Sequence, residues 1–95
     1  MAAYLVVDID VTDPEAYEEY RSLVPPLIAK YGGRYLVRGG AFEKLEGGWT
    51  PKRLVLLEFP SAGRAKEFYE SEEYRPVKEI RLRSANSSVV LVEGA

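Results

Sequence analysis

The side chains available for chemistry in this chain are carboxylates, arginines, lysines, tyrosines and hydroxyls, because the sequence contains no cysteine and no histidine. Thiol nucleophiles, Ser-His and Cys-His pairs, imidazole acid–base chemistry, and the usual zinc, haem and iron–sulfur ligands are therefore excluded. Any catalysis must use the remaining polar side chains or a borrowed cofactor. We predict no metal site and no cofactor of the protein's own.

Three charged residues form the candidate catalytic group: Asp8, Glu58 and Arg34. We expect the strands that carry Asp8 and Glu58 to lie parallel at the centre of a sheet, which would bring both carboxylates to the same end, with Arg34 beside Glu58. A carboxylate in a partly apolar pocket has a raised pKa and can act as a general base while an arginine stabilises an oxyanion. The alternative is a structural ion-pair network at the sheet edge.

Two other patterns have simpler explanations. Asp8, Asp10 and Asp13 lack the glycine and glutamate of a calcium loop, so we interpret them as a strand end and a helix cap. The glycine pairs at 39–40 and 47–48 lack the spacing of a phosphate-binding loop, so we interpret them as turns. We expect most tyrosines to be core residues of helix faces whose hydroxyls reach an edge, and a pocket role is the alternative. These are Tyr17, Tyr20, Tyr31, Tyr69 and Tyr74.

The elements that must position these residues follow from hydrophobic periodicity and from helix start and stop signals. Asp13-Pro14 predicts a helix start, and Gly32-Gly33 predicts its end, with a kink at Pro25-Pro26. Ser61 is a candidate cap for a second helix, extended by a short helical segment over 71–82 that is interrupted at Pro76. Four strands are predicted over 4–11, 34–38, 53–59 and 87–92, with a long, bent hairpin arm between the second and the third.

This order predicts one domain spanning residues 1–95, of the α+β class, with the ferredoxin-like βαββαβ plan. Helices would cover one face of a four-stranded antiparallel sheet and leave the other face open. The runs Leu54-Val55-Leu56-Leu57 and Val89-Val90-Leu91-Val92 are apolar at every position, so both faces must be covered. We therefore predict a homodimer formed through the open sheet face.

Charge and hydropathy limit the other partners. The net charge of −2 arises from acidic and basic residues mixed along the chain, which disfavours nucleic acid and anionic membranes as partners. The start of the chain does not resemble a signal peptide, and no apolar run approaches the length of a membrane span. We expect a cytoplasmic protein.

Several short motifs together resemble one family over nearly the whole chain. They are Asp13-Pro14 with Tyr17 and Tyr20, Gly32-Gly33, Arg38-Gly39-Gly40, Leu45-Glu46-Gly47, Arg53, Glu58-Phe59-Pro60-Ser61, and Tyr69-x-Ser71-x-x-Tyr74 with Arg81. The chain resembles the uncharacterised family known as domain of unknown function 1330. The resemblance implies the dimeric α/β-barrel form of the ferredoxin-like fold and a superfamily of cofactor-independent monooxygenases, isomerases, dehydratases, haem-degrading enzymes and non-catalytic binding proteins. The residues that it marks for testing, beside Glu58, are Arg38, Glu46, Arg53, Tyr69, Tyr74 and Arg81.

Three functions stay open at this point. The first is a cofactor-independent enzyme, of the monooxygenase or isomerase type, that holds a small apolar or aromatic molecule in the cleft between sheet and helices. Asp8 or Glu58 would be its base, and Arg34 or Arg38 its anion stabiliser. The second is a module that binds a small acidic metabolite through Arg38 and Arg53 without chemistry. The third is a structural dimer.

Overall fold

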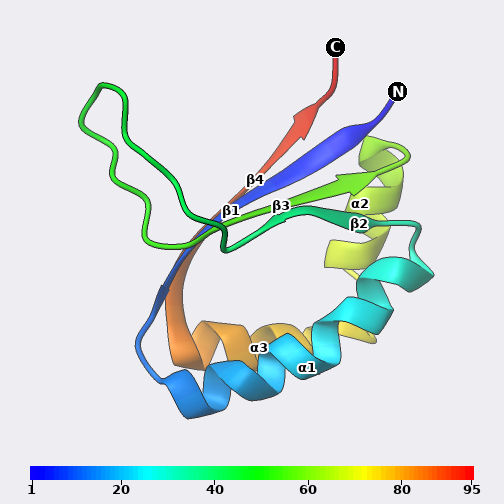
Figure 1. The fold of residues 1–95 in the computed structure, drawn as a ribbon. Coiled ribbons are helices and arrows are strands. Elements are labelled where there is room, and N and C mark those ends of the chain that lie inside the picture. The colour runs from blue at the N-terminus through cyan, green and yellow to red at the C-terminus, as the bar shows by residue number, and fades with distance from the viewer.

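The computed structural model describes residues 1–95 and confirms the ferredoxin-like α+β fold, with three helices against one face of a curved four-stranded sheet (Figure 1). None of the helices has both the length and the apolar character needed to cross a membrane. The elements in chain order are β1 (Ala3–Val11), α1 (Pro14–Lys30), β2 (Arg34–Arg38), β3 (Leu54–Phe59), α2 (Ala62–Tyr69), α3 (Tyr74–Ser84) and β4 (Ala85–Glu93).

The sheet has the order β2-β3-β1-β4, and every neighbouring pair of strands is antiparallel. The prediction that the first and third strands lie parallel is therefore wrong. The α1 crossover makes β2 run in the direction of β1, and β3 turns back from β2 and inserts between them, so it opposes both. Tyr4 pairs with Glu58, whereas Asp8 pairs with Leu54.

The first helix begins and ends at the predicted signals. The Asp13 carboxylate accepts a hydrogen bond from the backbone N–H of Ala16 at 3.3 Å, and Pro14 occupies the first helical position, where its missing N–H leaves no bond unmade. Gly32, at φ +82°, turns the chain towards β2. The helix remains continuous through Pro25 and Pro26. One face is buried against the sheet, through Tyr17, Tyr20, Val24 and Ile28.

The third helix corrects the prediction of an extension interrupted at Pro76. Helix α3 is a separate helix, and Pro76 is its third residue. The N–H groups of a helix's first turn have no intrahelical partner, so a proline there removes no bond. Its buried residues Val77, Ile80 and Ser84 continue the helical layer beside α1.

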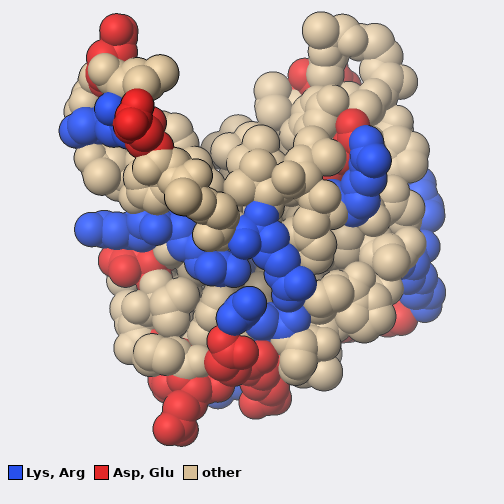
Figure 2. All heavy atoms as spheres, in the orientation of Figure 1, with Lys and Arg blue, Asp and Glu red and all other residues tan.

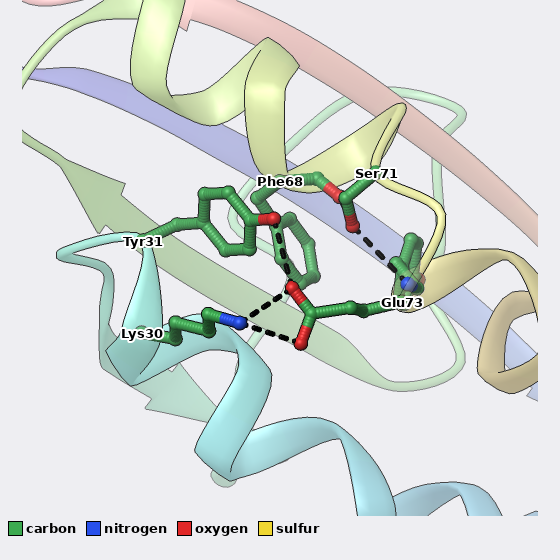
Figure 3. A network of polar contacts seen from close by, with 6 residues as sticks. Lys30, Tyr31, Phe68, Ser71 and Glu73 are labelled. Atoms are coloured by element: carbon green, nitrogen blue, oxygen red, sulfur yellow. Dashed lines mark hydrogen bonds and ion pairs between the residues drawn. The ribbon is translucent and has the colours of Figure 1, made fainter.

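A polar network fastens the end of α1 to the junction between α2 and α3 (Figure 3). The Lys30 ammonium donates to both carboxylate oxygens of Glu73 at 2.7 Å, and the Tyr31 hydroxyl donates to one of them at 3.2 Å. These hydrogen bonds lower the pKa of Glu73 and raise that of Lys30. Ser71 accepts a hydrogen bond from the Tyr74 backbone N–H at 3.1 Å, which orients the start of α3.

The sheet face away from the helices carries a band of apolar side chains. It consists of Tyr4, Val6, Leu54, Leu56, Val90 and Val92, which are neighbours across the three strands β3, β1 and β4. Val90 is 58% exposed and Val92 is 46% exposed in the single chain. The face that was predicted to need a second copy is therefore uncovered in one protomer.

Residues 39–53 connect β2 to β3 as the predicted long arm, which projects from the edge of the sheet on the side away from the helices (Figure 1). Residues 41–50 are all exposed. They include the large apolar side chains of Phe42, Leu45 and Trp49, of which Leu45 is 85% exposed.

Candidate functional site

A cavity of about 40 Å³ lies between the sheet and the helical layer. A volume of this size holds only a few water molecules. Most of its lining is aliphatic or aromatic, and none of the lining residues is acidic. Its polar side chains are the arginines Arg21, Arg38, Arg53 and Arg81 and the tyrosines Tyr17, Tyr20, Tyr35, Tyr69 and Tyr74.

The arginines from the two sides of the cavity approach the same end of the sheet. The backbone N–H of Ile9 donates to the carbonyl of Arg53 at 2.9 Å, and Ile9 pairs with Ser87 on its other side. The guanidinium of Arg81 reaches over from α3 and donates to the Ser87 hydroxyl. The backbones of Arg53 and of Ser87, which the Arg81 guanidinium contacts, are therefore two strand spacings apart, about 10 Å, with β1 between them.

These guanidinium groups have few protein partners. Arg81 is only 2% exposed, and the Nε atoms of Arg21, Arg53 and Arg81 are buried without a hydrogen-bond partner. Arg21 reaches one carboxylate, Glu18, at 2.7 Å on the exposed side of α1. A buried N–H without an acceptor is unfavourable by about 1–3 kcal/mol, and more for a charged group. The cavity thus contains donors and positive charge in excess of acceptors.

A β-bulge in β2 turns Arg38 towards the cavity. Tyr35 pairs with Leu57 and Arg38 pairs with Val55, and one extra residue between them shifts the register. Both pairing partners face the helices, so Tyr35 and Arg38 face the same side although they are three residues apart. Regular alternation would have placed Arg34 and Arg38 together. The Arg38 guanidinium lies 4.7 Å from the centre of the Tyr35 ring, a cation–π contact.

Helix α1 supplies an acceptor that holds Arg38. In an α-helix the carbonyl of Arg21 would accept from the N–H of residue 25, but Pro25 has no N–H. The guanidinium of Arg38 donates to this carbonyl instead, at 3.1 Å. The proline therefore creates the acceptor that fixes an arginine at the mouth of the cavity.

The absence of a side chain at Gly39 leaves room for the guanidinium of Arg53. Gly39 has φ +70°, and its N–H donates to the carbonyl of Leu54 at 2.8 Å. The Arg53 guanidinium packs directly on the Gly39 α-carbon, where a Cβ would overlap it. A glycine is needed here both for the backbone conformation and for the arginine.

Tyrosine hydroxyls form the polar part of the cavity wall on the helical side. Tyr20 and Tyr74 share a buried hydrogen bond of 2.8 Å between their hydroxyls. Burial, with the Tyr74 oxygen nearby, raises the pKa of Tyr20 far above its ordinary value, and burial also raises the pKa of Tyr35. The Tyr20 and Tyr35 hydroxyls are therefore neutral at physiological pH and act as hydrogen-bonding groups.

The three predicted catalytic residues lie outside this cavity and do not form one cluster. The register places Asp8 and Glu58 about 13 Å apart along the sheet, because β1 and β3 are antiparallel. Both face the open side, and Glu58 forms an exposed ion pair with Arg34 at 2.7 Å. Hydrogen bonds from the backbone N–H of Lys52 and from Trp49 lower the pKa of Asp8, which is opposite to the shift expected for a general base.

Most of the predicted binding residues lie together around the cavity, unlike the predicted catalytic residues. The cavity is lined by Arg38, Arg53, Tyr69, Tyr74 and Arg81, whereas Glu46 lies in the exposed arm. Sequence reasoning missed Arg21 and Tyr35 and assigned Tyr17 and Tyr20 mainly to the core. For Arg21 a signal existed, since it lies four residues after Tyr17 on the apolar helix face, where a charged residue is unexpected.

Solved structures with the same fold come from several organisms. A protein of unknown function from Rhodopseudomonas palustris has a TM-score of 0.79 at 18% identity, over 99% of this chain and 82% of its own. A dimeric ferredoxin-like protein of unknown function from Jannaschia sp. CCS1 has a TM-score of 0.72 at 12% identity, over 99% and 100%. The cofactor-independent oxygenase SnoaB from Streptomyces nogalater has a TM-score of 0.68 at 10% identity, over 99% and 93%. At these identities the likeness shows a shared fold.

The comparison with proteins of curated function finds no match. A family model described as Domain of unknown function (DUF1330) matches residues 2–95. The resemblance drawn from the motifs is thereby confirmed, and the chain belongs to this family.

Proposed function

We propose that the cavity binds a small organic anion with an apolar or aromatic body, and that Arg38 and Arg53 hold its charged group. One observation carries this proposal: four arginines and no acidic residue line a cavity whose other walls are aliphatic and aromatic side chains. A buried positive charge is unfavourable unless it is paired. A bound anion would supply the missing charge and accept from the unpaired Nε–H groups.

The geometry favours a planar oxyanion such as a carboxylate. A guanidinium presents a flat fork of N–H donors that matches two carboxylate oxygens, and such charge-assisted hydrogen bonds are about twice as strong as neutral ones. Figure 2 shows lysine and arginine atoms gathered in the middle of one face, between the base of the arm and α1. An anion would therefore approach the cavity from a positively charged surface.

The remaining walls fit an apolar body. Leu5, Val7, Val24 and Leu57 supply aliphatic surface, and Phe68 and the tyrosines supply aromatic surface. The present volume of about 40 Å³ limits the ligand to a small molecule, or to one that moves Arg38, which is exposed at the mouth. A ring bearing one acidic group exceeds this volume, so it would enter by displacing the exposed part of the Arg38 side chain.

Binding without chemistry is better supported than the enzyme also predicted from the sequence. The arginines would stabilise a substrate anion, but neither Asp8 nor Glu58 lines the cavity, and no other carboxylate is there to act as general base. The oxygenase from Streptomyces nogalater shares the fold, which hosts unrelated functions.

The test is isothermal titration calorimetry with benzoate, using two arginines of the same strand. Arg38→Ala should weaken benzoate binding by roughly tenfold or more, which corresponds to a lost charge-assisted hydrogen bond. Arg34→Ala is the matched control, because Arg34 faces the other side of the sheet and pairs with Glu58. Uncharged benzamide should bind weakly to every variant. Equal benzoate affinities for the two variants would rule out the proposed site.

We also propose that two copies pair through the open sheet face. The apolar band on that face is exposed in one chain, and the molecule is hollowed on this side between the arm and the chain ends (Figure 2). At about 25 cal/mol per Å², covering several hundred Å² of apolar surface stabilises a dimer by several kcal/mol. The protein from Jannaschia sp. CCS1 is described as dimeric, which supports a homodimer. The cytoplasmic location stays a prediction.

A further inference from the structure

Asp8, expected to be a catalytic base, instead holds the arm. One carboxylate oxygen accepts from the backbone N–H of Lys52 at 2.9 Å, and the other accepts from the indole N–H of Trp49 at 3.1 Å. Both donors belong to the returning part of the arm, which otherwise has no helix or strand to fix it. The carboxylate thus anchors an exposed segment to the central strand β1.

The anchored segment leads directly to the arginine of the cavity. Lys52 is adjacent to Arg53, and Ile9, adjacent to Asp8, donates its N–H to the Arg53 carbonyl at 2.9 Å. Two successive residues of the arm are therefore fixed to two successive residues of β1. The Arg53 guanidinium is confined further by its packing on Gly39.

We propose that Asp8 is a positioning residue of the anion site: by anchoring the arm it fixes the Arg53 guanidinium over the cavity. This inference rests on the proposed function, because it treats Arg53 as an anion ligand. Asp8 itself faces the opposite side of the sheet from the cavity and would not touch an anion bound there.

The site requires a carboxylate and not merely a polar side chain of the same shape. The two donors from the arm are both N–H groups, so both oxygens of Asp8 must accept. An asparagine would offer one oxygen and one NH₂, and the NH₂ would face an N–H donor. Asp8→Asn is therefore a nearly isosteric change that should break one of the two anchoring bonds.

The experiment compares benzoate binding and the Arg53 side-chain signal in four proteins: the full chain as it stands, Asp8→Asn, Arg53→Ala and the double variant. Asp8→Asn should weaken benzoate binding by roughly threefold to tenfold, the equivalent of one hydrogen bond. In the Arg53→Ala background Asp8→Asn should not weaken benzoate binding further, because Asp8 affects the anion only through Arg53. In ¹⁵N NMR spectra, Asp8→Asn should shift the Arg53 Nε–H resonance without ligand present.

Asp10→Asn is the matched control, since Asp10 lies on the same strand, is exposed and pairs with Asn86 of β4, away from the arm. The single tryptophan, Trp49, reports release of the arm through its fluorescence. An unchanged Arg53 signal or an unchanged benzoate affinity in Asp8→Asn would overturn the inference, as would equal weakening with and without Arg53. If the unaltered protein binds no benzoate while Asp8→Asn still shifts the Arg53 signal, the proposed function fails and the positioning role stands.

Discussion

Replacing Gly39 by alanine should reduce anion affinity more than it reduces stability. The added Cβ would overlap the guanidinium of Arg53, and the backbone at Gly39 has φ +70°, which L-residues adopt at a disadvantage of about 1–2 kcal/mol. The overlapping atoms belong to the far end of a long side chain, so Arg53 can swing away. The fold survives, and the cavity loses one of its arginines.

The two effects have separable magnitudes. The backbone term should lower the melting temperature by about 4–15 °C in a chain of this size. The loss of Arg53 from the site should weaken benzoate binding by roughly tenfold to a hundredfold, from 1.5–3 kcal/mol for a hydrogen bond to a charged group. Circular dichroism during heating measures the first effect, and isothermal titration calorimetry well below the transition measures the second.

Gly47→Ala separates the backbone effect from the effect on Arg53. Gly47 also has a positive φ, +95°, but a Cβ there meets nothing within 4 Å. The Gly47→Ala variant should lose no more stability than Gly39→Ala does, and its affinity for benzoate should be unchanged. If Gly39→Ala binds benzoate as tightly as Gly47→Ala does, Arg53 is not a ligand of the anion and the reasoning is refuted.

Three further predictions concern the cavity wall, the arm and the open face. Tyr20→Phe leaves the buried hydroxyl of Tyr74 without its partner and should lower the free energy of unfolding by about 1–3 kcal/mol in urea titrations, while the double Phe variant should lose less than the sum of the single changes. The pKa of Asp8 is held below its ordinary value of 3.8 by the Lys52 N–H, so the stabilisation by Asp8 is present above that value and is lost as pH falls through the lowered pKa. Trp49 fluorescence should therefore show arm release only below pH 3.8. Val90→Asp places a charge on the open face and should make the protein monomeric in sedimentation at micromolar concentration.

Each of these predictions has a result that contradicts it. Additive losses in the Phe variants would show that the two hydroxyls do not depend on one another. The same acid transition of Trp49 in Asp8→Asn would assign it to another group. A dimer that persists in Val90→Asp would place the interface elsewhere on the molecule.

Local signals in the sequence predicted the helix ends well, because a capping side chain and the backbone N–H that donates to it lie within a few residues of each other. Asp13 and Ser61 both cap the helices assigned to them. The antiparallel pairing of β1 and β3 follows from the connections between elements and not from local composition, and there the prediction was wrong. Pro76 was misinterpreted because a proline has opposite meanings in the first turn and in the interior of a helix.

Only part of the residues that line the cavity, and none of their arrangement, could be predicted from the sequence. The family resemblance marked Arg38, Arg53 and Arg81, and all three line one cavity. Nothing in the pattern of residues 34–38 reveals the bulge that separates Arg34 from Arg38, because a bulge changes register without changing composition. The role of Asp8 was out of reach as well, since its donors lie more than 40 residues away in a segment without periodicity.

Pro25, in the middle of α1, bears on how fast an anion would leave the cavity. The carbonyl of Arg21, left free by Pro25, and the ring of Tyr35 already restrict the side chain of Arg38 before any ligand arrives. Ordering a free side chain on binding opposes association by about 0.5–1.5 kcal/mol, and this penalty is reduced when the side chain is preorganised. Such a gain appears chiefly as a longer residence time. The hydrogen bond that α1 lacks at Pro25 would thus slow the release of the anion, although Pro25 does not line the cavity.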